Sequence, residues 1–102
     1  GALNELREPD DEVRALVASV RSTVEQVKKT EYDAFLPHSY RTQIVAGTNY
    51  YVKVQTMITG DLRRNVGSCI LLKIFKPLPH TGEPHQLIGI KDIMEDEMID
   101  GF

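Results

Sequence analysis

Cys69 and three histidines could in principle supply a nucleophile, a base or metal ligands. A thiolate beside an imidazole could attack a carbonyl carbon, and His38, His80 and His85 could contribute to a metal site. The histidines lack metal-ligand spacing, although the turn from His80 to His85 could hold a metal weakly. Cys69 begins a strand-like run, at the end of the expected sheet opposite to His80. We therefore expect a buried thiol, no metal, no cofactor and no enzymatic activity.

Acidic side chains gather near the C-terminus without the alternating oxygen ligands of a tight calcium loop. They are Asp92, Glu95, Asp96, Glu97 and Asp100. We interpret this run as a solvated segment lying over the interspersed Ile93, Met98 and Ile99.

Noncovalent contact with another protein is the chemistry indicated by an uncharged stretch in mid-chain. Its residues are Gln43, Ile44, Val45, Ala46 and Gly47, and the strand-like run 48–54 follows at once. Gly47 accepts a positive φ or a bulged geometry, and Ala46 keeps the bend free of bulk. We interpret the stretch as one long strand that a small-residue kink bends into a blunt, apolar hairpin tip. A β-bulge that merely curves the sheet remains the alternative.

Apolar residues spaced three, four and seven apart predict one helix between about Asp10 and Thr30. They are Val13, Leu16, Val17, Val20, Val24 and Val27. Acidic residues precede this run, while Lys28 and Lys29 end it, as the helix dipole favours. Valine is a mediocre helix former, so this helix should draw its stability from packing on a sheet.

The rest of the chain predicts strands with one apolar and one mixed face. Tyr50, Val52 and Val54 alternate with Tyr51, Lys53 and Gln55, and Ile70, Leu72 and Ile74 alternate with Leu71, Lys73 and Phe75. A third run from Gln86 to Ile93 should place Ile88 and Ile90 on one face. One helix followed by consecutive hairpins predicts the α+β class with an antiparallel sheet.

The turns of such a meander alternate between the two ends of the sheet. The bend at Ala46 and Gly47 and the turn from Pro77 to Pro84 should therefore lie at one end, on the order of 10 Å apart at the usual strand spacing. The turn from Thr56 to Ser68 should project from the other end. Leu78 and Pro79 would form an apolar tip of restricted conformation.

Length and composition favour one domain over residues 1–102. The net charge of −3 gives no basic surface for nucleic acid. No apolar run approaches the roughly 18 residues that span a bilayer, and the N-terminus lacks the basic flank and apolar core of a signal peptide. With a single cysteine, the sequence favours a soluble, leaderless protein of a reducing compartment, the cytoplasm.

Gln43 to Gly47 match the Gln-x-Val-x-Gly signature of the cystatins. Thr48-Asn49-Tyr50-Tyr51, Leu72 to Phe75, Leu78-Pro79 and the final Ile99-Asp100-Gly101-Phe102 follow in the family's order. The chain therefore resembles the stefins, the intracellular branch of that family, over nearly its whole length. The resemblance implies a cystatin-like fold, in which an antiparallel sheet wraps around one long α-helix.

The resemblance also implies three elements that contact a protease. They are a trunk of Gly1, Ala2 and Leu3, the central hairpin from Gln43 to Gly47, and a second hairpin of Leu78, Pro79 and His80. The expected function is reversible, competitive and noncovalent inhibition of papain-like cysteine proteases of the cathepsin type, by a monomer. Two alternatives stay open: a non-inhibitory binding module that uses the enlarged turn 56–68, and a dimer formed by strand exchange at the central hairpin.

Overall fold

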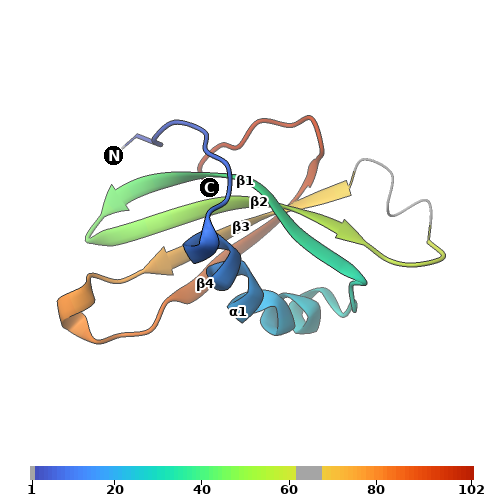
Figure 1. Cartoon of the computed structure of the whole chain (residues 1–102), viewed down its shortest axis with the longest axis horizontal. Coiled ribbons are helices and arrows are strands. Elements are labelled where there is room, and N and C mark those ends of the chain that lie inside the picture. Colours follow the sequence, from blue (N-terminus) through green and yellow to red (C-terminus); the bar gives the residue numbers. More distant parts are fainter. Residues whose placement is uncertain (1, 62–67) are drawn as a thin grey trace.

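One α-helix, one short 3-10 helix and four strands make up the computed structural model, which describes residues 2–61 and 68–102. Along the chain they are α1 (Asp11–Lys28), β1 (Ala34–Val45), β2 (Gly47–Met57), β3 (Ser68–Lys76), a short 3-10 helix η1 (Pro79–Thr81) and β4 (Gln86–Met94). The strands form an antiparallel meander in the order β1-β2-β3-β4. α1 lies on one face of this sheet and both terminal segments lie on the other (Figure 1). The predicted α+β class is confirmed.

α1 begins and ends close to the predicted boundaries. The Asp10 side chain accepts a hydrogen bond from the backbone N–H of Val13 at 2.9 Å, which caps the first turn. At the other end Lys29 adopts a left-handed conformation, with φ of 52°. Five of the six predicted apolar residues are buried, but Val27 in the last turn is 63% exposed, which corrects the prediction.

The core between α1 and the sheet is built from the buried helix residues and one face of each strand. Its sheet side comprises Phe35, Tyr40, Val52, Val54, Ile70, Leu72 and Ile74, with Tyr50, Leu87 and Ile90 partly buried beside them. Ile88 was expected beside Ile90, and this prediction is wrong. Lys73 pairs with Gly89 and Ile74 with Leu87, so Ile88 is the extra residue of a bulge and is 48% exposed.

The second face of the sheet carries a smaller core beneath the terminal segments. Tyr51, Cys69, Leu71, Ile93 and Ile99 are buried there, and Leu3 packs against them. Ile93 and Ile99 thus lie beneath the acidic run as predicted, but Met98 is 75% exposed. Lysines of this face donate to backbone carbonyls of the C-terminal segment, Lys53 Nζ to Glu95 and Glu97, and Lys73 Nζ to Phe102.

In the described ranges 2–61 and 68–102, no helix combines the length and apolar character needed to cross a membrane.

Candidate functional site: two hairpin tips and the N-terminal segment

The first hairpin reverses the chain at Ala46. Val45 pairs with Gly47 and Ile44 with Thr48, so β1 and β2 are two antiparallel strands joined by a tight turn. The hairpin tip was predicted, but the single kinked strand and the bulge that merely curves the sheet were not correct descriptions. Gly47 has φ of 127°, and a β-carbon added there would lie 2.6 Å from the carbonyl oxygen of Lys76 and 2.7 Å from the Phe75 ring. Glycine is therefore required by both conformation and space.

The tip of this hairpin presents uncharged apolar surface to solvent. Ile44 is 63% exposed and Val45 is 41% exposed, and Ala46 between the strands is exposed as well. Successive strand residues point to opposite faces, so Ile44 and Val45 present apolar groups on both sides of the tip. A partner that enclosed the tip would remove both from water.

Gln43 braces the hairpin from within. Its side-chain Oε1 accepts hydrogen bonds from Asn49 Nδ2 at 3.0 Å and from the Tyr51 hydroxyl at 3.2 Å. Asn49 lies directly opposite Gln43 in the β1–β2 ladder, and both donors belong to buried residues. The motif predicted Gln43 as a contact residue, and no local signal indicated this bracing role.

The second hairpin places Leu78 and His80 at an exposed turn. The backbone N–H and hydroxyl of Thr81 both donate to the Leu78 carbonyl, at 3.1 and 2.8 Å, and the Gly82 N–H donates to Pro79. Leu78, Pro79 and His80 are exposed, whereas Pro77 at the base is buried. The loop is thus held by its own hydrogen bonds, and its tip is free for contact.

Both hairpin tips lie at the same end of the sheet, as the meander predicted (Figure 1). Their bases touch, because Thr48 pairs with Lys76 at the end of β3. β2 ends at Met57 and β3 begins at Ser68, at the opposite end of the sheet. Of the predicted turn from Thr56 to Ser68, residues 62–67 lie outside the described structure.

A polar cluster ties α1 to this end of the sheet. Lys76 Nζ donates to Glu12 Oε1 at 2.6 Å, and the Tyr50 hydroxyl donates to the same oxygen at 2.9 Å. The bonds from Lys76 and Tyr50 lower the pKa of Glu12. Burial, with the Glu12 carboxylate adding to it, raises the pKa of Tyr50 to about 12. Sequence reasoning missed this cluster, whose members come from three elements.

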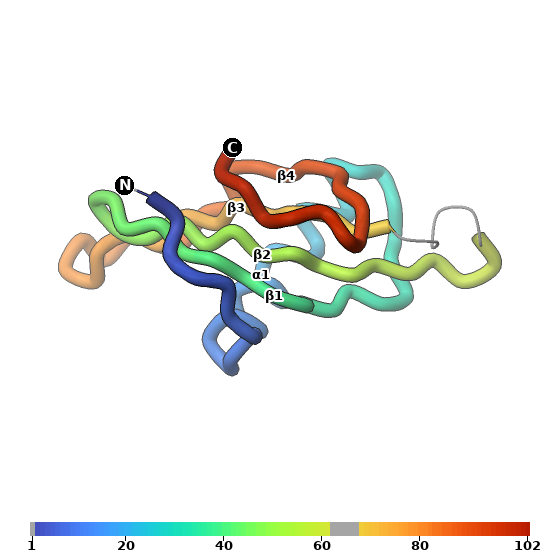
Figure 2. The backbone as a smooth tube through the Cα atoms, turned by 90° about the horizontal axis from the view of Figure 1, so that it is seen from above, coloured from blue at the N-terminus to red at the C-terminus, as the bar shows by residue number. Residues whose placement is uncertain are grey.

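The N-terminal segment also reaches this end (Figure 2). Gly1 lies outside the described residues; Ala2 is exposed, and Leu3 is partly buried against the second core. Asn4 is held on β1, where its backbone N–H donates to the Thr42 carbonyl at 2.7 Å. The described part of the predicted trunk therefore starts beside the first hairpin.

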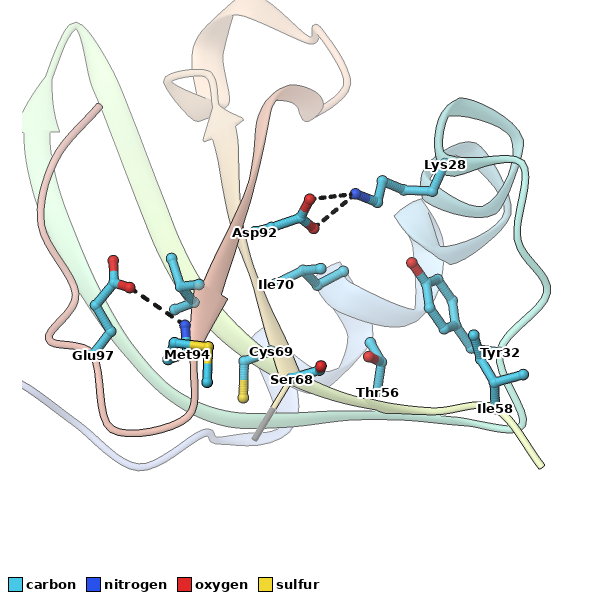
Figure 3. A pocket seen from close by; sticks show the side chains of 11 residues that line it. Lys28, Tyr32, Thr56, Ile58, Ser68, Cys69, Ile70, Asp92, Met94 and Glu97 are labelled. Carbon is cyan, nitrogen blue, oxygen red and sulfur yellow. Dashed lines mark hydrogen bonds and ion pairs between the residues drawn. The ribbon is translucent and has the colours of Figure 1, made fainter. Parts of the chain in front are cut away.

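The thiol expected to be inert lies far from both tips. Cys69 is buried near the start of β3, and burial raises the pKa of its thiol. It borders a cleft of about 360 Å³, beside which Lys28 Nζ and the Asp92 carboxylate pair at 2.7 Å (Figure 3). None of the described residues lining this cleft is a histidine. Cys69 therefore has no imidazole base there.

The histidines are dispersed over the molecule. His38 Nδ1 lies 3.1 Å from the Ser39 hydroxyl, and His85 Nε2 lies 2.7 Å from that of Ser19. His80 is exposed on the second hairpin. Among residues 2–61 and 68–102, no three His, Cys, Asp or Glu side chains converge in a way that could hold a metal ion.

Comparison with known proteins gives a consistent result. A cystatin domain model matches residues 1–83. The whole chain is 34% identical to Cystatin-A of Homo sapiens, covering 97% of that protein, and 33% identical to Leukocyte cysteine proteinase inhibitor 1 of Sus scrofa, covering 92%. Cystatin-B of Mus musculus is 36% identical over 72% of this chain and 66% of its own length. The chain therefore belongs to the cystatin family, in the stefin branch that its motifs indicated.

Proposed function

We propose that this protein is a reversible, competitive and noncovalent inhibitor of papain-like cysteine proteases. Its contact edge would consist of the trunk 1–3, the first hairpin 43–47 and the second hairpin 78–80, inserted together into the active-site cleft. The name of the Sus scrofa relative, Leukocyte cysteine proteinase inhibitor 1, supports this activity class. We propose proteases of the cathepsin type as the physiological targets.

The observation that carries the proposal is that two exposed hairpin tips share one end of the sheet. Ile44 and Val45 on one tip and Leu78 on the other are the apolar groups that a cleft would remove from water. Each tip is already held by hydrogen bonds in the free protein, which limits the conformational entropy lost on binding. The first tip, residues 43–47, has no ionisable side chain and brings no charge into the interface.

The shape of the first tip supports a noncovalent mode. A protease nucleophile attacks a peptide bond held in a near-attack geometry within an extended segment. The reversal at Ala46 prevents the chain on either side from continuing extended through the cleft. We therefore expect the inhibitor to be recovered intact from the complex, as intact-mass analysis after dilution would test.

A steady-state inhibition assay against papain and a panel of cathepsins, with thiol present, tests the activity. Competitive inhibition that reverses on dilution is the expected result. If the folded protein inhibits none of these enzymes, the proposal is wrong, and a non-inhibitory binding module on the same fold becomes the better explanation. Size-exclusion chromatography of the assayed sample shows whether a monomer or a strand-exchanged dimer is the active form.

A matched pair of substitutions locates the inhibitory surface. Val45→Asp places a charge on the first tip, where a desolvated apolar contact is expected, and should weaken inhibition of papain by about 100-fold. Val27→Asp makes the same change at an exposed position of α1, away from the contact edge. It should leave inhibition unchanged. Equal inhibition by both variants would refute the assignment of the first hairpin.

The free, buried thiol of Cys69 suits a reducing compartment, and we propose the cytoplasm as the site of action. Fractionation of expressing cells would test this location, and recovery of the protein only with secreted or vesicular markers would contradict it.

A further inference from the structure

We propose that Arg41 is a positioning residue that fixes the N-terminal trunk beside the first hairpin and thereby sets how much the trunk adds to protease affinity. The affinity part rests on the proposed function, because the trunk must contact a protease to contribute. The docking of residues 2–8 on the sheet is a property of the free protein and can be measured without a protease.

The N-terminal segment occupies the outer edge of the sheet. Among the strands of the described ranges 2–61 and 68–102, β1 is the first of the meander and pairs with β2 on one side only, so it forms an edge of the sheet. Arg7 and Tyr40 exchange backbone hydrogen bonds there at 2.9 and 3.0 Å, and the Asn4 N–H donates to Thr42 at 2.7 Å. Figure 2 shows this segment running along β1 toward the hairpin tip. Pairing with the edge of β1 therefore places the N-terminal segment at the end of the sheet that carries the hairpin tips.

Arg41 joins this segment to the other end of the chain. Its Nε donates to the Asn4 carbonyl at 2.8 Å, and its Nη1 donates to the Ile99 carbonyl at 2.8 Å. The Ile99 side chain is buried in the second core, so the carbonyl that accepts the hydrogen bond from Arg41 belongs to a well-packed residue. A planar guanidinium offers donors in one rigid arrangement, whereas a lysine ammonium on a flexible stem does not.

Asn4 is the residue next to the trunk at which the N-terminal segment is hydrogen-bonded to the sheet. Its backbone N–H bonds to Thr42, its carbonyl to Arg41, and its side-chain Nδ2 to Thr42 Oγ1 at 2.9 Å. Ala2 and Leu3 therefore precede a residue that is fixed next to the first hairpin, and Leu3 itself packs against the second core. Releasing the Asn4 carbonyl would free more of the segment, and binding would then have to order it at a cost in conformational entropy.

A double-mutant cycle with papain tests the coupling between Arg41 and the trunk. Arg41→Ala and Arg41→Lys are each made in the full chain and in a chain that lacks Gly1 and Ala2. In the full chain, loss of the charged hydrogen bond to Asn4 should raise the inhibition constant about tenfold for alanine, with lysine between alanine and wild type. In the shortened chain the effect should fall to about twofold or less.

Lys73→Met is the matched control. Lys73 Nζ donates to the Phe102 carbonyl on the same face at 2.5 Å and lies 5.4 Å from the centre of the Tyr51 ring, so its contacts are with the C-terminal segment and the sheet. Any effect of this substitution on the inhibition constant should be equal in both chain lengths. A loss for Arg41→Ala that persists unchanged after trunk deletion would assign Arg41 a general structural role and overturn the proposal.

Backbone ¹⁵N relaxation of the free protein supplies a readout that needs no protease. Arg41→Ala, or Arg41→Lys where the alanine variant fails to fold, should lower the order parameters of Ala2, Leu3 and Asn4. In the Lys73→Met control these three residues should keep their wild-type order parameters. Unchanged order parameters in the Arg41 variants would refute the positioning role. A wild-type protein that inhibits no protease would instead refute the proposed function and leave this measurement of Arg41 valid.

Discussion

Replacing Gln43 by alanine should destabilise the protein as well as weaken inhibition, because it removes an internal brace of the first hairpin. The Gln43 Oε1 accepts from Asn49 and from Tyr51, which are only 8% and 2% exposed. A buried donor left without its acceptor costs about 1 to 3 kcal/mol. Gln43 is half-buried, so water can reach part of the vacated space and each donor should cost near the lower limit. We expect a total loss of about 2 kcal/mol of unfolding free energy.

Thermal unfolding measured by circular dichroism gives the test. For a domain of this size, 1 kcal/mol corresponds to about 4 to 8 °C in Tm, so Gln43→Ala should lower Tm by about 8 to 16 °C. Gln43→Glu is the control, because a carboxylate keeps the two acceptor positions. It should recover most of the lost Tm near neutral pH.

The result that refutes this reasoning is equally specific. A Tm for Gln43→Ala equal to that of the wild-type protein would show that the two hydrogen bonds do not brace the hairpin. Weaker inhibition with an unchanged Tm would make Gln43 a direct contact of the protease, as the sequence motif alone suggested.

Two further predictions concern the cluster at Glu12 and the turn at the opposite end of the sheet. Hydrogen bonds from Lys76 and Tyr50 lower the pKa of Glu12 in the folded protein below its value in the unfolded chain. At pH values above the pKa of the unfolded chain these bonds therefore stabilise the folded protein. This stability is lost as the pH falls through the pKa of Glu12 in the folded protein. Urea unfolding should therefore give the wild-type protein a larger unfolding free energy than Glu12→Gln near neutral pH, and this difference should shrink in acid. A difference that grows in acid would contradict the prediction. Replacing the turn between Thr56 and Ser68 by a short Asn-Gly turn should leave the inhibition constant for papain unchanged, because this turn leaves the opposite end of the sheet. A large loss of affinity would place part of the site there.

The spacing of apolar residues along the sequence predicted the helix and the direction of most of its buried side chains. The helix ends and five of its six buried residues followed from apolar spacing and charge. Val27 has the right direction around the helix but is exposed, because periodicity gives the direction of a side chain and not the extent of its cover. Ile88 failed for a different reason: the bulge opposite Lys73 and Ile74 shifts the alternation within β4.

The interactions that hold the candidate site together had no local signal. Arg41 bonds to Asn4 and Ile99, which are 37 and 58 residues away, and Lys76 bonds to Glu12 across 64 residues. Such pairs depend on which strands become neighbours, and no spacing within one element encodes them. The motif from Gln43 to Gly47 did indicate a hairpin tip, but it did not separate Gln43, which braces the tip, from Ile44 and Val45, which it exposes.

The cations on the second face of the sheet explain how a domain with one helix can hold its termini in place. Arg41, Lys53 and Lys73 all donate to backbone carbonyls of the terminal segments. Carbonyl groups of a segment without secondary structure need partners once the segment covers a core, and long basic side chains supply them while their stems cover apolar surface. The segments that the cations hold in turn bury Tyr51, whose hydroxyl supports Gln43. The rigidity of the first hairpin therefore depends on contacts made by both ends of the chain.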